Sequence, residues 1–175
     1  FELLAGGKVL RSSGLDAPAP AEVERPGAVA LDREGFYDAC RARGFDYEED
    51  RRPVHGIRVA SSGVTAFLDP GDGAEPERRG RALEGCFQAI GAALAAGGWA
   101  RLESIERVRA RPVLGERLRL EVEVEPGRIV RALAVDEGSG LASIEFLGMV
   151  HRAAPGPVAA GPRLELEADL LPEER

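Results

Sequence analysis

Apolar and polar side chains alternate along most of the second half of this chain, and this feature constrains its fold most strongly. The pattern is clearest in RLRLEVEVE (117–125), whose apolar positions would share one face: Leu118, Leu120, Val122 and Val124. Alternation with a period of two is typical of a β-strand that buries one side. The stretches 99–113, 128–136 and 141–152 alternate in the same way, with turn residues between them. The sequence therefore predicts an antiparallel meander of consecutive strands.

The first half of the chain predicts a helix and a hairpin before a second, longer helix. Residues 31–44 predict a helix with Asp32 as its N-cap and Gly44 as its stop signal. Residues 55–69 predict a β-hairpin, because apolar residues alternate on both sides of a Ser-Ser-Gly turn. The segment 69–81, DPGDGAEPERRGR, is rich in Gly and Pro and is interpreted as a loop.

The helix predicted for RALEGCFQAIGAAL (81–94) contains many small residues. Its expected buried positions recur at helical spacing: Leu83, Phe87, Ile90 and Leu94. Its small residues would let a sheet approach the helix backbone closely, and they are Gly85, Ala89, Gly91, Ala92 and Ala93. An antiparallel sheet wrapped around one central helix is the hot-dog fold. The sequence thus predicts an α+β protein with this fold.

The chain divides into one domain and its flanking segments. Residues 1–13 are interpreted as a strand left from a preceding segment, and residues 14–30 as a Pro/Ala-rich linker. The hot-dog domain is expected over 31–153, followed by a linker or tail over 154–175. A lone hot-dog leaves a sheet edge unpaired. We therefore expect it to form a homodimer or to pair with a second hot-dog half.

The composition argues against several classes of function. A net charge of −7 and a pI near 5.0 argue against nucleic-acid binding, which needs basic patches. No apolar run approaches the roughly 18 residues of a membrane-spanning helix, so no membrane association is expected. Cys40 and Cys86 do not have a metal-ligand spacing, so no metal site is expected. Reduced thiols also fit a cytoplasmic protein.

Three stretches of the sequence carry a resemblance to a known family. The first, residues 36–59, has aromatic residues and glycines that lead from a helix into a strand: Phe36, Tyr37, Gly44, Phe45, Tyr47 and Gly56. The second is the helix 81–94, in which a carboxylate is followed four residues later by Gln. The third, 135–153, is a turn into a strand that ends in Arg. In this order, the region 33–153 resembles the C-terminal hot-dog half of a dehydratase domain from a modular polyketide synthase.

The chain departs from this family's pattern at several positions. Where the family has His-Pro before the helix, this chain has Arg79 and Gly80. The family's Tyr-Gly-Pro signature is replaced by Tyr-Glu-Glu at 47–49, and the nearby Phe by Arg51. The family's catalytic His belongs to a His-X3-Gly-X4-Pro motif in the other, N-terminal half. This chain contains no such motif.

The resemblance implies roles for three residues in a 3-hydroxyacyl-thioester dehydratase. Glu84 would be the catalytic acid, and Gln88, one helical turn later, would orient its carboxyl group. A carboxyl group buried in an apolar tunnel would have the raised pKa that an acid requires. His55 is a better candidate for the base than His151, because the strand before the helix can approach the helix N-terminus. The alternatives are that Glu84 is a polar residue near a helix N-terminus and that both histidines are ordinary strand-edge residues.

Three arginines near the start of this helix are candidates for substrate binding. Arg78, Arg79 and Arg81 could contact the phosphate of a phosphopantetheine arm or an acidic acyl carrier protein. The alternative is a solvated, charged loop. The domain would need no cofactor of its own, since the phosphopantetheine arm only carries the substrate.

Two hypotheses about function follow from the resemblance. The first is a dehydratase-like domain (a lyase, if active) of a modular or iterative polyketide synthase, acting on 3-hydroxyacyl thioesters bound to a carrier protein. The second is a non-catalytic module of such a megasynthase that serves as scaffold, dimer contact or acyl-chain holder. A cyclase or isomerase on the same fold is a third possibility. The missing His motif favours the second hypothesis for this chain by itself.

Overall fold

The computed structural model describes residues Leu15, Val23, 25–95, 100–111, 114–125 and 128–153, so the strand predicted over 1–13 and the tail over 154–175 lie outside them. In chain order the elements are β1 (Val29–Asp32), α1 (Arg33–Arg41), the short 3₁₀ helix η1 (Glu49–Arg51), β2 (Val54–Ala60), β3 (Gly63–Leu68), α2 (Glu75–Ala95), β4 (Ala100–Ala110), β5 (Leu118–Glu125), β6 (Arg128–Asp136) and β7 (Ala142–Ala153). Among the described residues, neither α-helix combines the length and the apolar character needed to cross a membrane.

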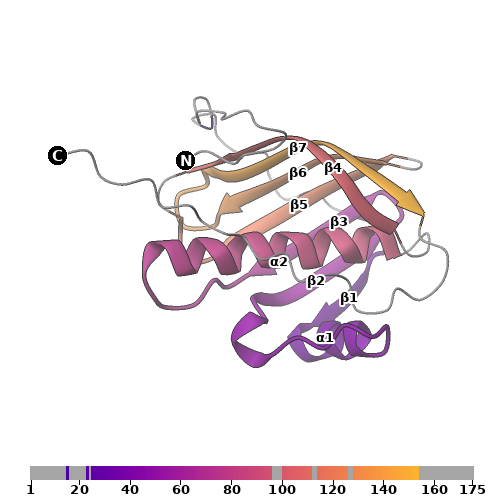
Figure 1. Ribbon diagram of the computed structural model, residues 1–175, viewed down its shortest axis with the longest axis horizontal. Helices are drawn as coiled ribbons and strands as arrows, with labels where there is room; N and C mark the ends of the chain where they lie inside the picture. The colour runs from indigo at the N-terminus through magenta and orange to yellow at the C-terminus, as the bar shows by residue number, and fades with distance from the viewer. Residues whose placement is uncertain are drawn as a thin grey trace.

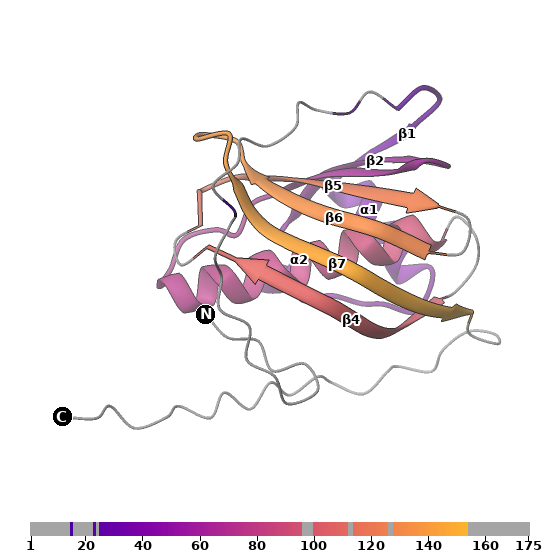
Figure 2. The same cartoon turned by 90° about the horizontal axis from the view of Figure 1, so that it is seen from above.

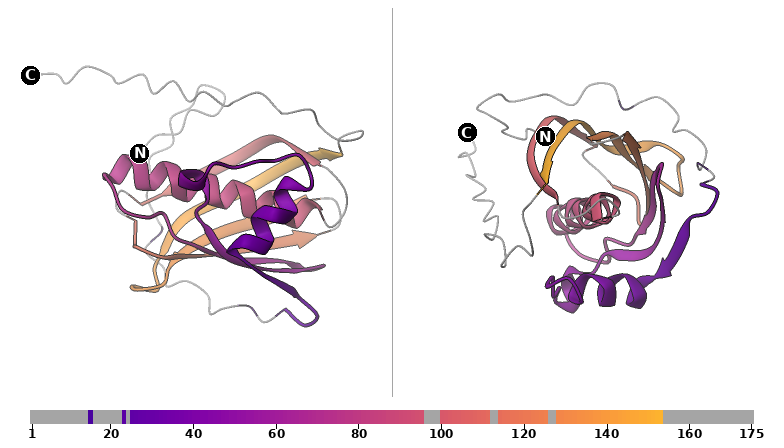
Figure 3. Two further views of the ribbon diagram at one scale, coloured as in Figure 1. Left: turned by 90° about the horizontal axis from the view of Figure 1, so that it is seen from below. Right: turned by 90° about the vertical axis from the view of Figure 1, so that its right-hand side faces the viewer.

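The strands form one seven-stranded antiparallel sheet in the order β1-β2-β3-β5-β6-β7-β4. The sheet curves around α2, which runs along its concave side (Figure 1). The end-on view in Figure 3 shows the strands passing around this helix, with α1 at the β1–β2 end of the sheet. The predicted α+β architecture, a hot-dog fold in which a sheet wraps around one central helix, is confirmed.

The predicted meander is present in β5, β6 and β7 but not in the strand before them. β4 pairs with β7 at one end of the sheet, and β3 lies beside β5 in its place. Figure 2 shows β4 and β7 side by side along this edge. Alternation in a sequence identifies a strand but not its neighbour, so the prediction of consecutive pairing is wrong for β4.

The alternation itself corresponds to the two sides of the sheet. On β5, Leu118, Leu120 and Val122 are fully buried in the core beneath α2. The buried face of α2 consists mainly of small side chains: Ala82, Cys86, Ala89, Ile90 and Ala93. Of the predicted positions whose side chains are described, Ile90 belongs to this buried face and Leu83 packs against it.

The other predicted core positions of α2 are less buried than expected. Phe87 is 37% exposed and Leu83 is only partly buried, while the side chain of Leu94 lies outside the described residues. Small side chains face the sheet because the strands approach the helix closely. At Gly85, an added Cβ would lie 2.9 Å from Cγ of Pro53. The close approach predicted from the small residues is therefore present at this position.

α2 begins earlier than predicted, inside the segment interpreted as a loop. Its first residue is Glu75, and Pro76 follows in the first turn, where a missing N–H breaks no helical hydrogen bond. The loop is therefore confined to residues 69–74. Pro and Gly in the sequence suggested a break, but a first-turn Pro favours the start of a helix.

α1 begins and ends as the sequence predicts. The Asp32 carboxylate accepts a hydrogen bond from the N–H of Gly35 at 2.9 Å, which makes it the N-cap. The chain leaves the helix through a turn in which Gly44 adopts a φ of 89°, a conformation that favours glycine. Phe36 and Tyr37 are buried, and they direct this helix toward the core.

Part of the segment 14–30, predicted as a linker, packs against the sheet. β1 lies at the end of this segment and pairs with β2. Before it, Arg25 donates a hydrogen bond to the buried Glu121 carboxylate at 3.4 Å. Leu15 is buried in a second cluster with Leu133, on the side of the sheet away from α2. The domain thus extends further toward the N-terminus than residue 31.

Candidate active site

Glu84 lies on α2 beyond its second turn and faces η1. Its Oε2 is 3.4 Å from Nε of Arg51, and 25% of its side chain is exposed. The structure therefore does not bury Glu84 in an apolar tunnel, as the acid role had predicted. Nor does it place Glu84 near the helix N-terminus, as the alternative had predicted, because α2 begins at Glu75. Glu84 is a partly exposed carboxylate paired with a cation.

Gln88 lies one turn further along α2 and is buried, with 7% of its surface exposed. Its Oε1 accepts a hydrogen bond from the Tyr37 hydroxyl at 2.7 Å, and its Nε2 donates to the carbonyl of Arg51 at 2.9 Å. Gln88 thus shares a helix face with Glu84, but its amide binds other groups. The expectation that this amide orients the Glu84 carboxyl group does not match its hydrogen bonds.

Two tyrosines, one on α1 and one in the connection that follows it, lie near Gln88 and Glu84. The Tyr37 hydroxyl also accepts a hydrogen bond from the N–H of Val54 at 2.9 Å. The rings of Tyr37 and Tyr47 meet edge to face, with centroids 5.9 Å apart. Burial raises the pKa of Tyr37 far above its usual range, and burial, with smaller contributions from Cys40 and the Glu84 charge, raises the pKa of Tyr47 to about 12. Both phenols remain protonated at neutral pH and can act as donors.

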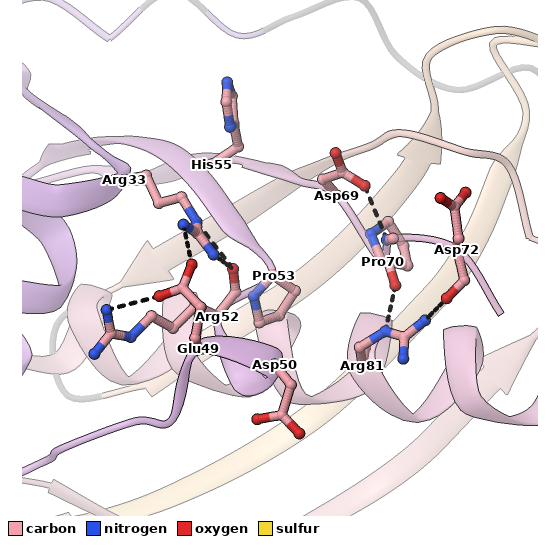
Figure 4. A pocket seen from close by; sticks show the side chains of 11 residues that line it. Arg33, Glu49, Asp50, Arg52, Pro53, His55, Asp69, Pro70, Asp72 and Arg81 are labelled. Carbon is pink, nitrogen blue, oxygen red and sulfur yellow. Dashed lines mark hydrogen bonds and ion pairs between the residues drawn. The ribbon is translucent and has the colours of Figure 1, made fainter.

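His55 is exposed on β2 and lines an open pocket of about 460 Å³. The pocket lies between β2, η1 and the loop before α2, and its lining is mostly charged: Arg33, Glu49, Asp50, Arg52, His55, Asp69, Asp72 and Arg81, with Pro53, Pro70 and Gly71. Figure 4 shows the imidazole pointing away from the ion-paired groups around Glu49. The structure thus brings His55 and Arg81 to one pocket, but Glu84 is not part of its lining.

His151 lies on β7, opposite Leu102 of β4 in the register of the sheet. His151 thus lies on the strand next to the edge strand β4. His55 lies on β2, next to β1 at the other edge of the sheet. The structure places the two histidines on different strands.

The three candidate arginines do not converge on one site: Arg78 and Arg79 both pair with Glu75, whereas Arg81 binds the loop before α2. Arg78 donates to the carbonyl of Gly115 at 2.8 Å, and Arg79 pairs with the carboxylate of Glu75 at 3.4 Å. Arg81 donates to the carbonyls of Pro70 and Asp72 and thereby closes the loop before α2. The alternative of a solvated charged loop does not describe them either: Arg79 is only 7% exposed. These arginines join α2 to its surroundings, and Arg81 alone lines the pocket.

Sequence reasoning missed the contacts that surround Glu84. Tyr37 is buried on α1, and a buried tyrosine hydroxyl needs a hydrogen-bond partner. That rule could have pointed to a polar group such as Gln88. Arg51 lies in a connection whose path no periodicity reveals, so its pairing with Glu84 left no signal in the sequence. Among the described residues, no three His, Cys, Asp or Glu side chains gather in a way that could hold a metal ion.

No protein-family model matches the sequence, and a search of curated proteins finds no match. Solved structures do match the fold. The dehydratase domain from the CurF module of the curacin polyketide synthase matches with a TM-score of 0.61 and 13% identity, over 79% of this chain and 54% of that one. The dehydratase domain from the terminal module of the rifamycin polyketide synthase matches with a TM-score of 0.59 and 21% identity, over 78% of this chain and 52% of that one.

A third similar structure is the dehydratase domain of RzxB from Pseudomonas fluorescens, with a TM-score of 0.57 and 13% identity over 81% of this chain and 53% of that one. This chain spans about half the length of the dehydratase domains that it matches. The likeness shows that the fold is one half of a double hot-dog. The resemblance noted from the sequence is confirmed at the level of the fold.

Proposed function

We propose that this chain is one hot-dog half of a dehydratase-like domain of a polyketide synthase, acting on 3-hydroxyacyl thioesters bound to an acyl carrier protein. The observation that carries the proposal is the position of Glu84: a carboxylate on the central helix of a hot-dog fold, still 25% exposed. The likeness in fold to three dehydratase domains, each about twice as long as the matched part, supports it.

The reaction needs a base for the C2 proton and an acid for the C3 hydroxyl. The base removes the C2 proton, a double bond forms between C2 and C3, and the C3–O bond breaks. Glu84 donates its proton to the departing hydroxyl, which leaves as water. The base comes from a partner half or a second copy of the chain, or is His55. Backbone N–H groups polarise the thioester carbonyl.

Arg51 must leave Glu84 before this carboxyl group can act as an acid. The Arg51 Nε lies 3.4 Å from Oε2 of Glu84, so the guanidinium lies where the substrate hydroxyl would have to approach this oxygen. The Arg51 side chain is 57% exposed, so it has room to move when substrate binds. Of the three candidate arginines, Arg81 is the one we propose for the phosphate of the phosphopantetheine arm, because it lines the pocket. The free thiols of Cys40 and Cys86 suit the reducing cytoplasm.

A second candidate function is a non-catalytic module of the same kind of synthase. The observation that favours it is that both polar residues of the helix face are already bound: Glu84 to Arg51, and Gln88 to Tyr37 and the Arg51 carbonyl. A carboxylate at this position could also serve as a base, as in a double-bond isomerase. That reaction would move a double bond without loss of water.

Mass spectrometry of a carrier-bound 3-hydroxyacyl thioester tests these candidates. The chain is incubated with this substrate alone and together with an N-terminal hot-dog half from a dehydratase domain. Dehydration predicts a product lighter by one water, and Glu84→Gln should slow its formation by about 100-fold or more. The matched control is Glu77→Gln, which removes an exposed carboxylate from the first turn of the same helix. Loss of water at an equal rate in both variants would show that Glu84 is not the acid. No loss of water in either preparation would make the non-catalytic module the better explanation.

A further inference from the structure

We propose that Tyr37 and Gln88 are positioning residues that fix the segment 51–54 against α2 and thereby hold the Arg51 guanidinium against the Glu84 carboxylate. The inference depends on the proposed function only for the importance of Glu84. The contact that it explains is the ion pair between Arg51 and Glu84, and the test of this contact needs no substrate.

The two side chains form a continuous set of hydrogen bonds between three elements. The N–H of Val54, at the start of β2, donates to the Tyr37 hydroxyl at 2.9 Å, and this hydroxyl donates to Oε1 of Gln88 at 2.7 Å. The Gln88 Nε2 then donates to the carbonyl of Arg51 at 2.9 Å. Tyr37 is 3% exposed and Gln88 is 7% exposed, so these bonds face little competition from water.

A packing contact also holds the segment 51–54 against α2. Pro53 lies against the backbone of α2 at Gly85, where its Cγ would be only 2.9 Å from an added Cβ. On its other side, the Pro53 carbonyl accepts a hydrogen bond from the N–H of Asp69 at 2.8 Å. Residues 51 and 53 thus contact α2 directly, at Gln88 and Gly85, and residue 54 reaches Gln88 through the Tyr37 hydroxyl.

The ion pair itself is too weak to explain its own position. The Arg51 side chain is 57% exposed and the Nε–Oε2 distance is 3.4 Å. Such solvent-exposed pairs contribute little, because water screens the charges and both long side chains lose freedom. Because the Arg51 backbone is fixed close to Glu84, its side chain loses less conformational freedom when the ion pair forms. The pairing therefore depends on the hydrogen bond that the Arg51 carbonyl accepts from Gln88.

Tyr37 is suited to this role at any physiological pH. Burial raises its pKa, so the hydroxyl keeps the proton that it donates to Gln88. The guanidinium of Arg52 lies over its ring, 5.4 Å from the centroid, and the Arg52 Nε donates to the carbonyl of Tyr47 at 2.8 Å. These contacts hold the ring of Tyr37 while its hydroxyl bridges β2 and α2.

The test follows the Arg51 Nε–H group by ¹⁵N NMR in a cycle of variants of the full chain. In the unmodified chain, Glu84→Gln should shift this signal, because the carboxylate is its neighbour. In the Tyr37→Phe background the same substitution should leave the signal unshifted, because Arg51 no longer lies against Glu84. Gln88→Met should have the same effect as Tyr37→Phe, and it provides a second variant if the first does not fold.

The matched control is Tyr47→Phe, which removes a hydroxyl from the neighbouring ring but leaves the Tyr37–Gln88 bonds in place. The response of the Arg51 signal to Glu84→Gln should survive in this background. An equal response in the Tyr37→Phe, Gln88→Met and unmodified backgrounds would overturn the inference. The experiment uses no substrate, so its result is independent of whether the chain dehydrates a thioester.

Discussion

At the scale of single residues, the buried carboxylate of Glu121 is balanced by two arginines and a threonine. Glu121 is 3% exposed, although it lies on the side away from α2. Its Oε2 accepts a hydrogen bond from Thr65 at 2.8 Å, and Arg25 lies 3.4 Å from the same oxygen. Arg119 lies 3.3 Å from the other oxygen. A buried carboxylate is tolerated only when paired and hydrogen-bonded in this way.

We therefore predict that Arg25→Met lowers the free energy of unfolding by about 3 kcal/mol, because it leaves a buried carboxylate short of one partner. Arg119 and Thr65 remain, which keeps the loss at the lower end of the range for broken buried pairs. Urea unfolding followed by circular dichroism measures it.

The matched control is Arg41→Met, which removes an exposed arginine from its pairs with Asp38 and Asp46. This substitution should cost less than about 1 kcal/mol. Equal losses in the two variants would show that Arg25 is not part of the folded domain's charge compensation.

The sequence could identify Glu84 and Gln88 as neighbours on one helix face but not their partners. Positions four apart in a helix lie close together, whatever surrounds them. Their partners were decided by tertiary contacts: Gln88 binds a buried tyrosine hydroxyl from α1, and Glu84 meets an arginine from η1. Helical spacing carries no information about such long-range contacts. Helical spacing therefore places Glu84 and Gln88 together, but the groups that bind them come from outside the helix.

At the scale of secondary-structure elements, two glycines of α2 lie in different surroundings. Gly85 lies against Pro53 and Leu68, 2.9 Å and 3.2 Å from the place where a Cβ would be. Gly91 has no other atom within 4 Å of that place and is exposed. The first glycine allows close packing, whereas the second only weakens the helix.

The two glycines predict opposite effects of one substitution. Gly91→Ala should raise the free energy of unfolding by up to about 1 kcal/mol, because alanine favours a helix. Gly85→Ala should lower it by about 1 kcal/mol, since overpacking against a rigid proline ring exceeds the gain in helix propensity. Denaturant unfolding of both variants against the unmodified chain measures the difference. A stabilised Gly85→Ala variant would contradict the close packing of Pro53 on α2.

α1 provides a second prediction at this scale. Asp32→Ala removes the carboxylate that accepts the N–H of Gly35 and should cost about 1 kcal/mol of stability. Asp38→Ala removes an exposed carboxylate of the same helix and should cost less, because its pair with Arg41 is solvent-exposed. Thermal unfolding of the two variants compares them directly. An equal midpoint in both would mean that the N-cap adds nothing to stability.

Local sequence signals fixed the ends of α1 and the β2–β3 hairpin, because caps and turns act within a few residues. They fail at the start of α2. The Gly- and Pro-rich segment 69–81 predicts a loop, but Pro76 lies in the first turn of the helix. They also failed at β4, whose partner β7 is about forty residues later in the chain. Strand pairing over such separations depends on the whole sheet, and alternation does not encode it.

At the scale of the whole molecule, the burial of four proton-bearing groups affects stability at high pH. Burial raises the pKa of Cys86 to about 12, and it also raises the pKa of Cys40 and of Tyr37. Burial is the main cause for Tyr47 as well, whose pKa rises to about 12. The folded state thus keeps protons that the unfolded state loses.

The sign of the pH dependence follows from these shifts. The stabilisation from Cys86 is fully present below its ordinary pKa of 9.0 and is lost as the pH rises from there toward about 12. The free energy of unfolding should therefore fall above pH 9, by at most about 1.4 kcal/mol per pH unit for each group. Urea unfolding between pH 8 and pH 10.5 measures the slope. Cys86→Ala should make it shallower, and an unchanged slope in that variant would rule out a contribution from this thiol.

The strand order has a consequence for how the chain reaches this structure. β2 with β3, and β5 with β6 and β7, can pair through short connections, so these units are able to form early. Joining β3 to β5 and β4 to β7 closes loops of several tens of residues, which costs more conformational entropy. During synthesis on the ribosome, β4 emerges well before β7. Until β7 is made, the edge of β4 that pairs with it stays unpaired. The central helix is thus enclosed only when the last described strand has been synthesised.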